Sequence, residues 1–204
     1  MKHLRLACCT VALALLAGCA AEPPAPSIAR EQGDWSQQHQ RLADLTDWQL
    51  AGKIAFRSPN QNRSANLDWH QNNQHYVITV SGPFGVGRNT LDGKPGNVTL
   101  ENSDGKYSAS TPEQLMEQQL GWSLPVSSLD NWVRGLKAPD SKGEFTYDSK
   151  GYPSTLKQDG WTIEYKQWSY ADGYWLPGRL RLQYGDITVT FVITQWQPTA
   201  SQQG

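Results

Sequence analysis

Residues able to do acid–base, nucleophilic or metal chemistry are few and scattered in this sequence. His39 falls on the polar side of an expected helix, and His70 and His75 flank an expected hairpin turn, with no cysteine or carboxylate at metal-ligand spacing. Ser81 lacks the Gly-x-Ser-x-Gly order of a hydrolase nucleophile. The stretch Gly85-Val86-Gly87 is too short for a dinucleotide-binding fingerprint. We therefore predict no catalytic residue, no metal site and no cofactor.

One cysteine near the N-terminus carries a stronger chemical signal. Cys19 ends the sequence Leu16-Ala17-Gly18-Cys19, which follows a basic start and an apolar run from Leu6 to Ala17. That run has the length of a secretory signal core and is too short to span a bilayer as a helix. An ordinary signal peptide with a chance cysteine is the alternative, and the combined pattern argues against it. We predict that Cys19 begins the mature chain, with a diacylglycerol on its thiol and a third acyl chain on its amine.

The composition is typical of a single exported domain behind such an anchor. The formal net charge is -1 without a basic patch, so nucleic acid is not expected as a partner. Cys8 and Cys9 leave with the signal, so packing alone must hold the domain together. The 9 tryptophans all follow the signal, and such rings fill cores or line apolar pockets. The predicted division is a signal peptide (1–18), a flexible Pro- and Ala-rich tether (19–33), one domain (34–197) and a polar tail (198–204).

Hydrophobic periodicity predicts one helix followed by many strands. Apolar residues at helical spacing run from Trp35 to about Asp47, with Asp34 as the N-cap. Apolar and polar residues then alternate with a period of two, which is typical of half-buried strands. A long loop is expected through Gly173 and Pro177. The predicted strands lie around 48–56, 65–69, 76–80, 89–91, 97–100, 106–108, 155–157, 161–165, 180–182 and 187–193.

Two helices are expected to interrupt these strands. Thr111-Pro112-Glu113 has the pattern of an N-cap, a first-turn proline and a first-turn acid. Ser127 or Ser128 is expected to cap the second helix. A single antiparallel sheet of this size tends to curl. We predict a mainly β fold in which the curled sheet has a concave face and the helices lie over it as a lid.

The loop at Gly82-Pro83-Phe84-Gly85-Val86-Gly87 places apolar side chains where polar ones are usual. Its glycines and proline predict a tight, exposed turn. Phe84 either folds back onto the core or protrudes into lipid or an apolar partner, and the loop alone favours neither.

These motifs together resemble the LolB family of outer-membrane lipoprotein localisation factors. No single motif is specific, but their order and spacing are, and the resemblance covers nearly all of the mature chain. The matching segments are Leu16–Cys19, Trp48–Phe56, Asn66–Trp69, Ser81–Gly85, Leu124–Val126 with Leu129 and Trp132, and Arg134–Leu136.

The resemblance implies a half-open antiparallel β-barrel with a helical lid over a hydrophobic cavity. It implies a monomeric receptor that accepts triacylated lipoproteins from a LolA-like periplasmic carrier and inserts them into the outer membrane. The protein would be lipid-anchored at the periplasmic face of that membrane, and Ala20, where an aspartate favours inner-membrane retention, agrees with this location. In the family an exposed leucine between Pro and Gly serves membrane insertion, so Pro83, Phe84, Gly85 and Val86 are the corresponding loop here.

Acyl chains are costly to expose, at about 0.8 kcal/mol per methylene, so such a receptor needs an apolar lining. Each candidate could instead be ordinary core. Other functions also stay open: a different envelope lipoprotein that binds an apolar ligand or acts as an assembly scaffold, or a hydrolase, which the missing nucleophile argues against. The candidate lining residues are Trp48, Leu50, Ile54, Phe56, Leu67, Trp69, Tyr76, Ile78, Leu115 and Trp132.

Overall fold

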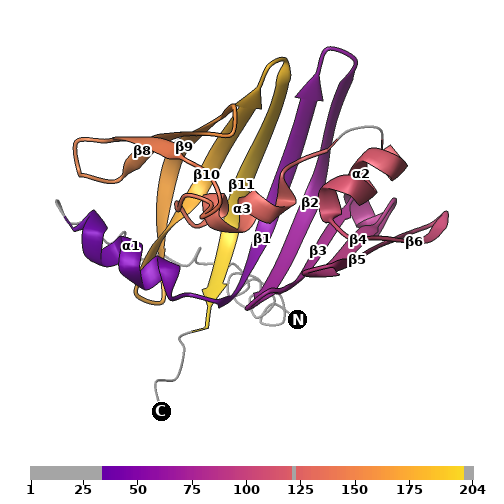
Figure 1. Cartoon of the computed structure of the whole chain (residues 1–204), viewed down its shortest axis with the longest axis horizontal. Helices are drawn as coiled ribbons and strands as arrows, with labels where there is room; N and C mark the ends of the chain where they lie inside the picture. Colours follow the sequence, from indigo (N-terminus) through magenta and orange to yellow (C-terminus); the bar gives the residue numbers. More distant parts are fainter. Residues whose placement is uncertain (1–33, 121–122, 200–204) are drawn as a thin grey trace, which may run out of the picture.

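The computed structural model describes residues 34–120 and 123–199, and these form one open antiparallel sheet with helices on one side (Figure 1). Cys19, the signal peptide and the tether therefore lie outside the described residues. Within the described part of the chain, no helix is long and apolar enough to cross a membrane.

The helices are α1 (Trp35–Ala43), α2 (Pro112–Leu120), α3 (Val126–Val133) and the 3-10 turn η1 (Pro83–Gly85). The strands are β1 (Asp47–Ser58), β2 (Gln61–Asn72), β3 (His75–Ser81), β4 (Asn89–Lys94), β5 (Asn97–Asn102), β6 (Gly105–Ala109), β7 (Gly143–Tyr147), β8 (Pro153–Gln158), β9 (Trp161–Ala171), β10 (Tyr174–Tyr184) and β11 (Ile187–Pro198).

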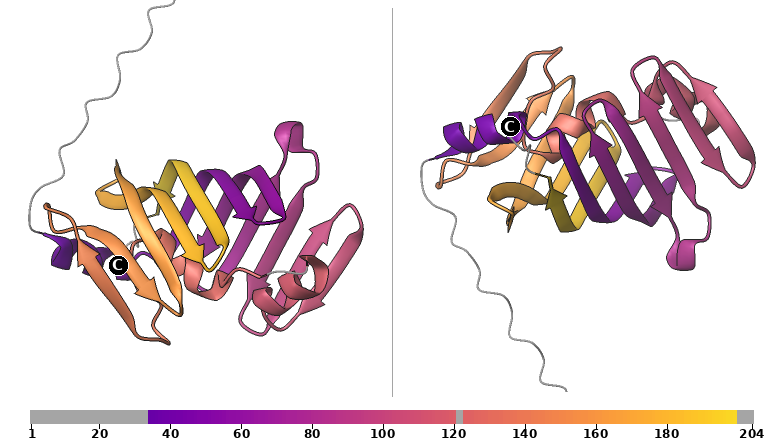
Figure 2. Two further views of the ribbon diagram at one scale, coloured as in Figure 1. Left: turned by 90° about the horizontal axis from the view of Figure 1, so that it is seen from above. Right: turned by 90° about the horizontal axis from the view of Figure 1, so that it is seen from below.

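The sheet contains eleven strands in the order β6-β5-β4-β3-β2-β1-β11-β10-β9-β8-β7. Each strand pairs with its neighbour in the chain, except that β1 joins β11 and the α2–α3 segment separates β6 from β7. Because β6 and β7 do not pair with each other, the sheet curls without closing. The predicted half-open barrel with a helical lid is confirmed, and Figure 2 shows its curvature from above and below.

Local capping chemistry sets where two helices begin. The Asp34 carboxylate accepts from the Gln37 N–H at 3.3 Å, as expected for the N-cap of α1. Thr111 Oγ1 accepts from the Gln114 N–H at 3.2 Å at the start of α2. The third helix differs from the prediction, because its N-cap is Pro125 and α3 begins at Val126.

Two strand predictions need correction. β7 was not predicted at all, and it forms the edge of the sheet beside β8. The expected loop through Gly173 and Pro177 is instead the β9–β10 hairpin, turned at Asp172-Gly173, with Pro177 inside β10. A register shift between Pro177 and Arg179 marks a bulge, where a strand tolerates the missing N–H of proline.

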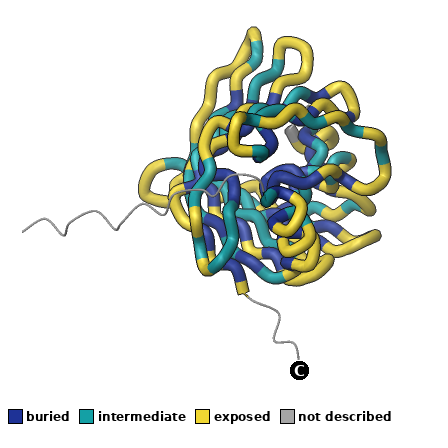
Figure 3. The backbone as a smooth tube through the Cα atoms, turned by 90° about the vertical axis from the view of Figure 1, so that its left-hand side faces the viewer, coloured by how far each residue is buried: buried dark blue, intermediate teal, exposed yellow. Residues whose placement is uncertain are grey.

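The core lies between the concave face of the sheet and the helices. Alternate residues of β1, β2, β10 and β11 are buried, and hairpin ends and loops are exposed (Figure 3). The ring of Trp48 packs against the rings of Trp69 and Trp196, with centroids 5.1 and 5.3 Å away. Gly52 lets β11 approach closely, because a Cβ there would stand 2.1 Å from the Val192 carbonyl oxygen.

Candidate functional site

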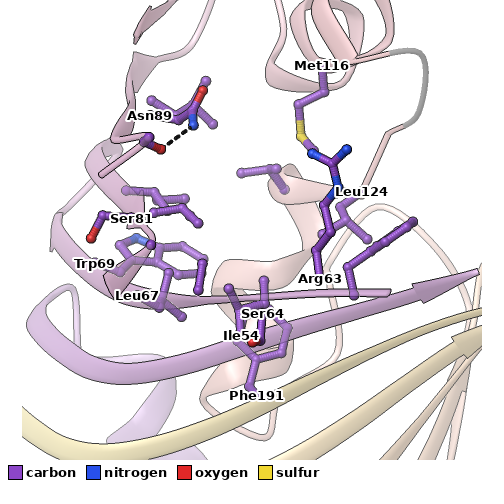
Figure 4. Close-up of a pocket in the computed structure, with 18 of the residues that line it drawn as sticks. Ile54, Arg63, Ser64, Leu67, Trp69, Ser81, Asn89, Met116, Leu124 and Phe191 are labelled. Atoms are coloured by element: carbon purple, nitrogen blue, oxygen red, sulfur yellow. Dashed lines mark hydrogen bonds between the residues drawn. The ribbon is translucent and has the colours of Figure 1, made fainter. Parts of the chain in front are cut away.

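A cavity of about 420 Å³ lies between the sheet and the lid helices. Its walls come from β1 to β5, β11, the η1 loop and the α2–α3 segment (Figure 4). The lining residues are Ile54, Phe56, Gln61, Arg63, Ser64, Ala65, Leu67, Trp69, Ile78, Val80, Ser81, Gly82, Val86, Gly87, Asn89, Leu91, Leu100, Met116, Leu124, Val126, Leu129 and Phe191.

Most of this wall is hydrocarbon. Leu67 and Trp69 reach the cavity from β2 and Ile78 from β3, because inward positions alternate along each strand. Met116 and Leu129 close the opposite side from α2 and α3. An apolar wall binds through area and shape, without directional bonds, so the cavity suits flexible alkyl groups of varied identity.

The polar part of the wall comes mainly from the start of β2 and the β3–β4 connection. Gln61, Arg63 and Ser64 are exposed residues that also contact the cavity, and Asn89 donates to the Gly87 carbonyl at 2.9 Å. Arg63 points from β2 toward Met116 of α2 (Figure 4). The cavity therefore has an apolar interior and a polar edge.

The η1 loop joins this edge and projects beyond the ends of β3 and β4 (Figure 2). Phe84 is fully exposed (104%) and Val86 is 72% exposed. Of the two alternatives left by the sequence, Phe84 therefore protrudes and does not fold back onto the core. The Gly82 N–H donates to the Val86 carbonyl at 2.8 Å, which closes the base of the loop. Phe84 has a φ of 57°, an uncommon conformation for a bulky residue. The hydrogen bonds within the loop hold this strained conformation in place.

The loop and the cavity are continuous. Gly82, Val86 and Gly87 contact the cavity, whereas Pro83, Phe84 and Gly85 form the tip beyond it. Among residues 34–120 and 123–199, Phe84 and Val86 are the protruding large apolar side chains beside this edge of the cavity. An alkyl chain that leaves the cavity here would pass them.

Five of the ten candidate lining residues share this wall. They are Ile54, Phe56, Leu67, Trp69 and Ile78, and all come from the first three strands.

The other five candidates lie away from the wall. Trp48 packs between two other tryptophans, and Leu50 is buried two residues further along β1. Tyr76 covers Gly93, where a Cβ would lie 2.3 Å from the tyrosine ring. Leu115 is fully buried in α2, and Trp132 donates from Nε1 to the buried side chain of Gln158 at 2.8 Å.

Several residues that line the cavity were not predicted from the sequence. Leu91, Leu100 and Phe191 lie on inward positions of β4, β5 and β11, and Met116 and Leu124 come from the lid segment. The alternation in those strands was the available signal, but it does not say which inward residues lie under the helices.

Buried polar contacts fix the end of α3 that adjoins α1. Arg134 donates from Nη1 to the carbonyls of Leu42 and Leu45, at 2.7 and 3.0 Å, and pairs with Asp130 at 3.1 Å. Burial lowers the pKa of Arg134 and raises the pKa of Asp130, while their attraction opposes both shifts. Arg134 therefore ties the end of α3 to α1 and to the segment that leads into β1.

A second link joins the two lid helices. Glu113 of α2 accepts from the N–H and the hydroxyl of Ser127 in α3, at 2.9 and 3.2 Å. Burial, followed by the charges of Glu113 and Asp92, raises the pKa of the Tyr76 phenol.

The titratable side chains are dispersed. Across residues 34–120 and 123–199, no three His, Cys, Asp or Glu residues gather where they could hold a metal ion. His75 contacts Asp92 at 2.9 Å on the surface, and Ser81 is buried at the end of β3.

The open sheet, the helical lid and the apolar cavity between them define a fold class, an incomplete antiparallel barrel with a helix-covered apolar cavity. Two solved structures share the fold. The LolA superfamily protein NE2245 from Nitrosomonas europaea has a TM-score of 0.54 at 9% identity, covering 80% of this chain and 93% of its own. A DUF1329 family protein from Desulfovibrio piger has a TM-score of 0.52 at 7% identity, covering 81% and 90%.

Sequence comparison identifies the family. Residues 46–196 match the family model described as outer membrane lipoprotein LolB. The outer-membrane lipoprotein LolB of Chromohalobacter salexigens is 52% identical over 187 residues, which cover 92% of this chain and 87% of that protein. That of Pseudomonas aeruginosa is 47% identical over 200 residues, covering 96% and 97%. The chain belongs to the LolB family.

Proposed function

We propose that this protein is a monomeric, outer-membrane-anchored receptor that takes triacylated lipoproteins from a LolA-like periplasmic carrier and releases them into the outer membrane. One observation carries the proposal: the apolar cavity opens beside a protruding apolar loop. Membership of the LolB family supports it.

The cavity suits the first step, uptake of an acyl chain. Each methylene moved out of water contributes about 0.8 kcal/mol, so an alkyl chain gains a large binding energy from Leu67, Ile78 and Leu129 without any specific bond. Transfer from carrier to receptor then needs only a higher affinity in the receiving cavity. Because this binding energy comes from the acyl chain and not from the protein part of a cargo, one cavity can serve many cargoes.

The η1 loop suits the second step, release into the bilayer. Phe84 and Val86 are already exposed, and their insertion into lipid buries apolar area at no cost to the core. Gly82 and Gly87 lie in this loop and also line the cavity, so insertion of the loop into lipid brings the cavity opening to the membrane surface.

The anchor suits the location. Acylation of Cys19 with several chains would hold the protein on the membrane permanently, because each chain adds its own partitioning energy. Residues 19–33 then link the folded domain to that anchor.

Obstruction of the cavity tests the proposal. Ala65 is a small lining residue opposite Ile54, so Ala65→Trp should fill the cavity. Ala55 lies on the neighbouring strand outside the lining, so Ala55→Trp is the matched control. Purified protein is mixed with a carrier loaded with an acylated protein, and movement of the cargo is followed by pull-down.

We expect transfer to the natural protein and to Ala55→Trp, and a transfer at least tenfold slower to Ala65→Trp. Equal transfer to both folded variants would exclude the cavity as the receiving site.

A further inference from the structure

The cavity volume limits how much hydrocarbon it holds. A cavity of about 150 Å³ lined by apolar side chains binds one benzene, which is about 25 Å³ per carbon atom. At that density the 420 Å³ found here holds about 17 carbons. A palmitoyl-sized chain of about 16 carbons therefore matches the volume of the cavity.

The walls that set this volume are fixed by contacts on the sheet side and the helix side. The floor is hydrogen-bonded sheet, with Leu67 paired to Val80 and Trp69 to Ile78. On the lid side, Arg134 holds the end of α3 and Glu113 links α2 to α3. These contacts hold the sheet side and the helix side of the cavity in place.

The polar edge of the cavity gives a bound chain a direction. Arg63 is the one charged side chain among the lining residues in the described part of the chain. It lies opposite Phe56 in the β1–β2 register and points toward Met116 (Figure 4). Arg63 makes no ion pair or side-chain hydrogen bond with another described residue, so its guanidinium donors are available to a ligand.

We propose that the cavity is a site for one acyl chain, whose tail lies among Leu67, Ile78 and Leu129 and whose ester or amide carbonyl accepts from Arg63. This rests on the proposed function and adds the number and direction of the chains. A guanidinium offers several N–H donors in a plane, which suits the carbonyls that join acyl chains to a glyceryl cysteine. A triacylated cargo then keeps two chains outside the cavity, where the carrier or the membrane must cover them.

Stoichiometry tests the capacity. The mature protein is titrated with a singly palmitoylated peptide and read by native mass spectrometry, with an unacylated peptide as the control for non-specific adducts. We expect one palmitoylated peptide per protein. Two or three saturable sites would overturn this inference and leave the proposed function standing, whereas no binding at all would overturn both.

A matched pair of variants tests the direction. Arg63→Leu removes the donors at the cavity edge. The control is Arg57→Leu, because Arg57 is an exposed arginine next to Phe56 in β1 and therefore faces the other side of the sheet. Each protein is titrated with the palmitoyl ester of a fluorescent dye and with the corresponding hexadecyl ether, which lacks the carbonyl.

Arg63→Leu should weaken binding of the ester about five- to tenfold and leave the ether unchanged, and Arg63→Lys should recover part of the loss. Arg57→Leu should change neither probe. An equal effect of Arg63→Leu on ester and ether, or no effect on either, would overturn the assignment of Arg63.

Discussion

The protruding loop offers a prediction that separates cargo uptake from membrane delivery. Phe84 contributes nothing to the core, because its side chain is fully exposed and the loop is closed by its own backbone hydrogen bonds. Phe84→Glu should therefore leave the free energy of unfolding within about 0.5 kcal/mol of its original value. Uptake from the carrier should also persist, because Phe84 is not part of the cavity wall.

Delivery should suffer strongly. Moving a phenylalanine side chain from water into an apolar phase contributes about 1.5–3 kcal/mol. Its loss corresponds to a reduction of about ten- to a hundredfold in the population of the inserted loop. A carboxylate in the hydrocarbon region adds a further penalty, so Phe84→Glu should be more severe than Phe84→Ala.

The assay uses cargo-loaded protein mixed with vesicles and measures the cargo recovered in lipid. Tyr147→Glu is the control, because Tyr147 is another aromatic residue, 52% exposed, on the distant edge strand β7. Delivery by Phe84→Glu at the original rate would refute the reasoning. So would an equal defect in Tyr147→Glu.

Three further predictions follow from single side chains. Gly52→Ala should lower the free energy of unfolding by about 1–3 kcal/mol in a denaturant titration, because its Cβ would meet the Val192 carbonyl oxygen, whereas Gly178→Ala, with nothing nearer than 3.5 Å, should cost less. Burial raises the pKa of Tyr165, so the folded state keeps a proton that the unfolded chain releases near pH 10; stability should hold below that pH and fall above it, and Tyr165→Phe should reduce the slope. Cys19→Ala should abolish acylation and membrane attachment, and mass spectrometry of the natural protein should show a mature chain that begins with acylated Cys19.

Features governed by local chemistry were accessible from the sequence. The caps Asp34 and Thr111 act within their own helical turns, so residue type and spacing were enough to predict them. The curled sheet and its lid were also predictable. Most strands pair with their neighbours in the chain, so the order of the strands and the position of the helical segment in the sequence were enough.

Features governed by distant contacts were not accessible. Pro177 argued for a loop, yet β10 accommodates it at a bulge, and its carbonyl accepts from Trp196 Nε1 at 2.9 Å. β7 is short and alternates weakly, and it pairs with β8 at the edge of the sheet while Phe145 packs against the core. The contact of Pro177 with Trp196 comes from another strand, and the weak alternation of β7 leaves no local signal for a strand.

The cavity shows the same division. Alternation identifies the inward face of β1, and it selected Trp48 and Ile54 equally. Ile54 lines the cavity together with residues of the lid helices, whereas Trp48 packs against Trp196 of β11. Which inward residues form a cavity and which form core is decided by the placement of α2 and α3.

Direct labelling of the binding site tests the central claim most sharply. A palmitoyl chain carrying a photoreactive group near its methyl end is bound to the protein, irradiated, and the labelled residues are mapped by peptide mass spectrometry. Labels should fall on the inward wall, at Leu67, Ile78, Leu100 or Leu129. Labels confined to the outer face of the sheet, or to the aromatic cluster formed by Trp35 of α1 and Trp168 of β9, would contradict the account.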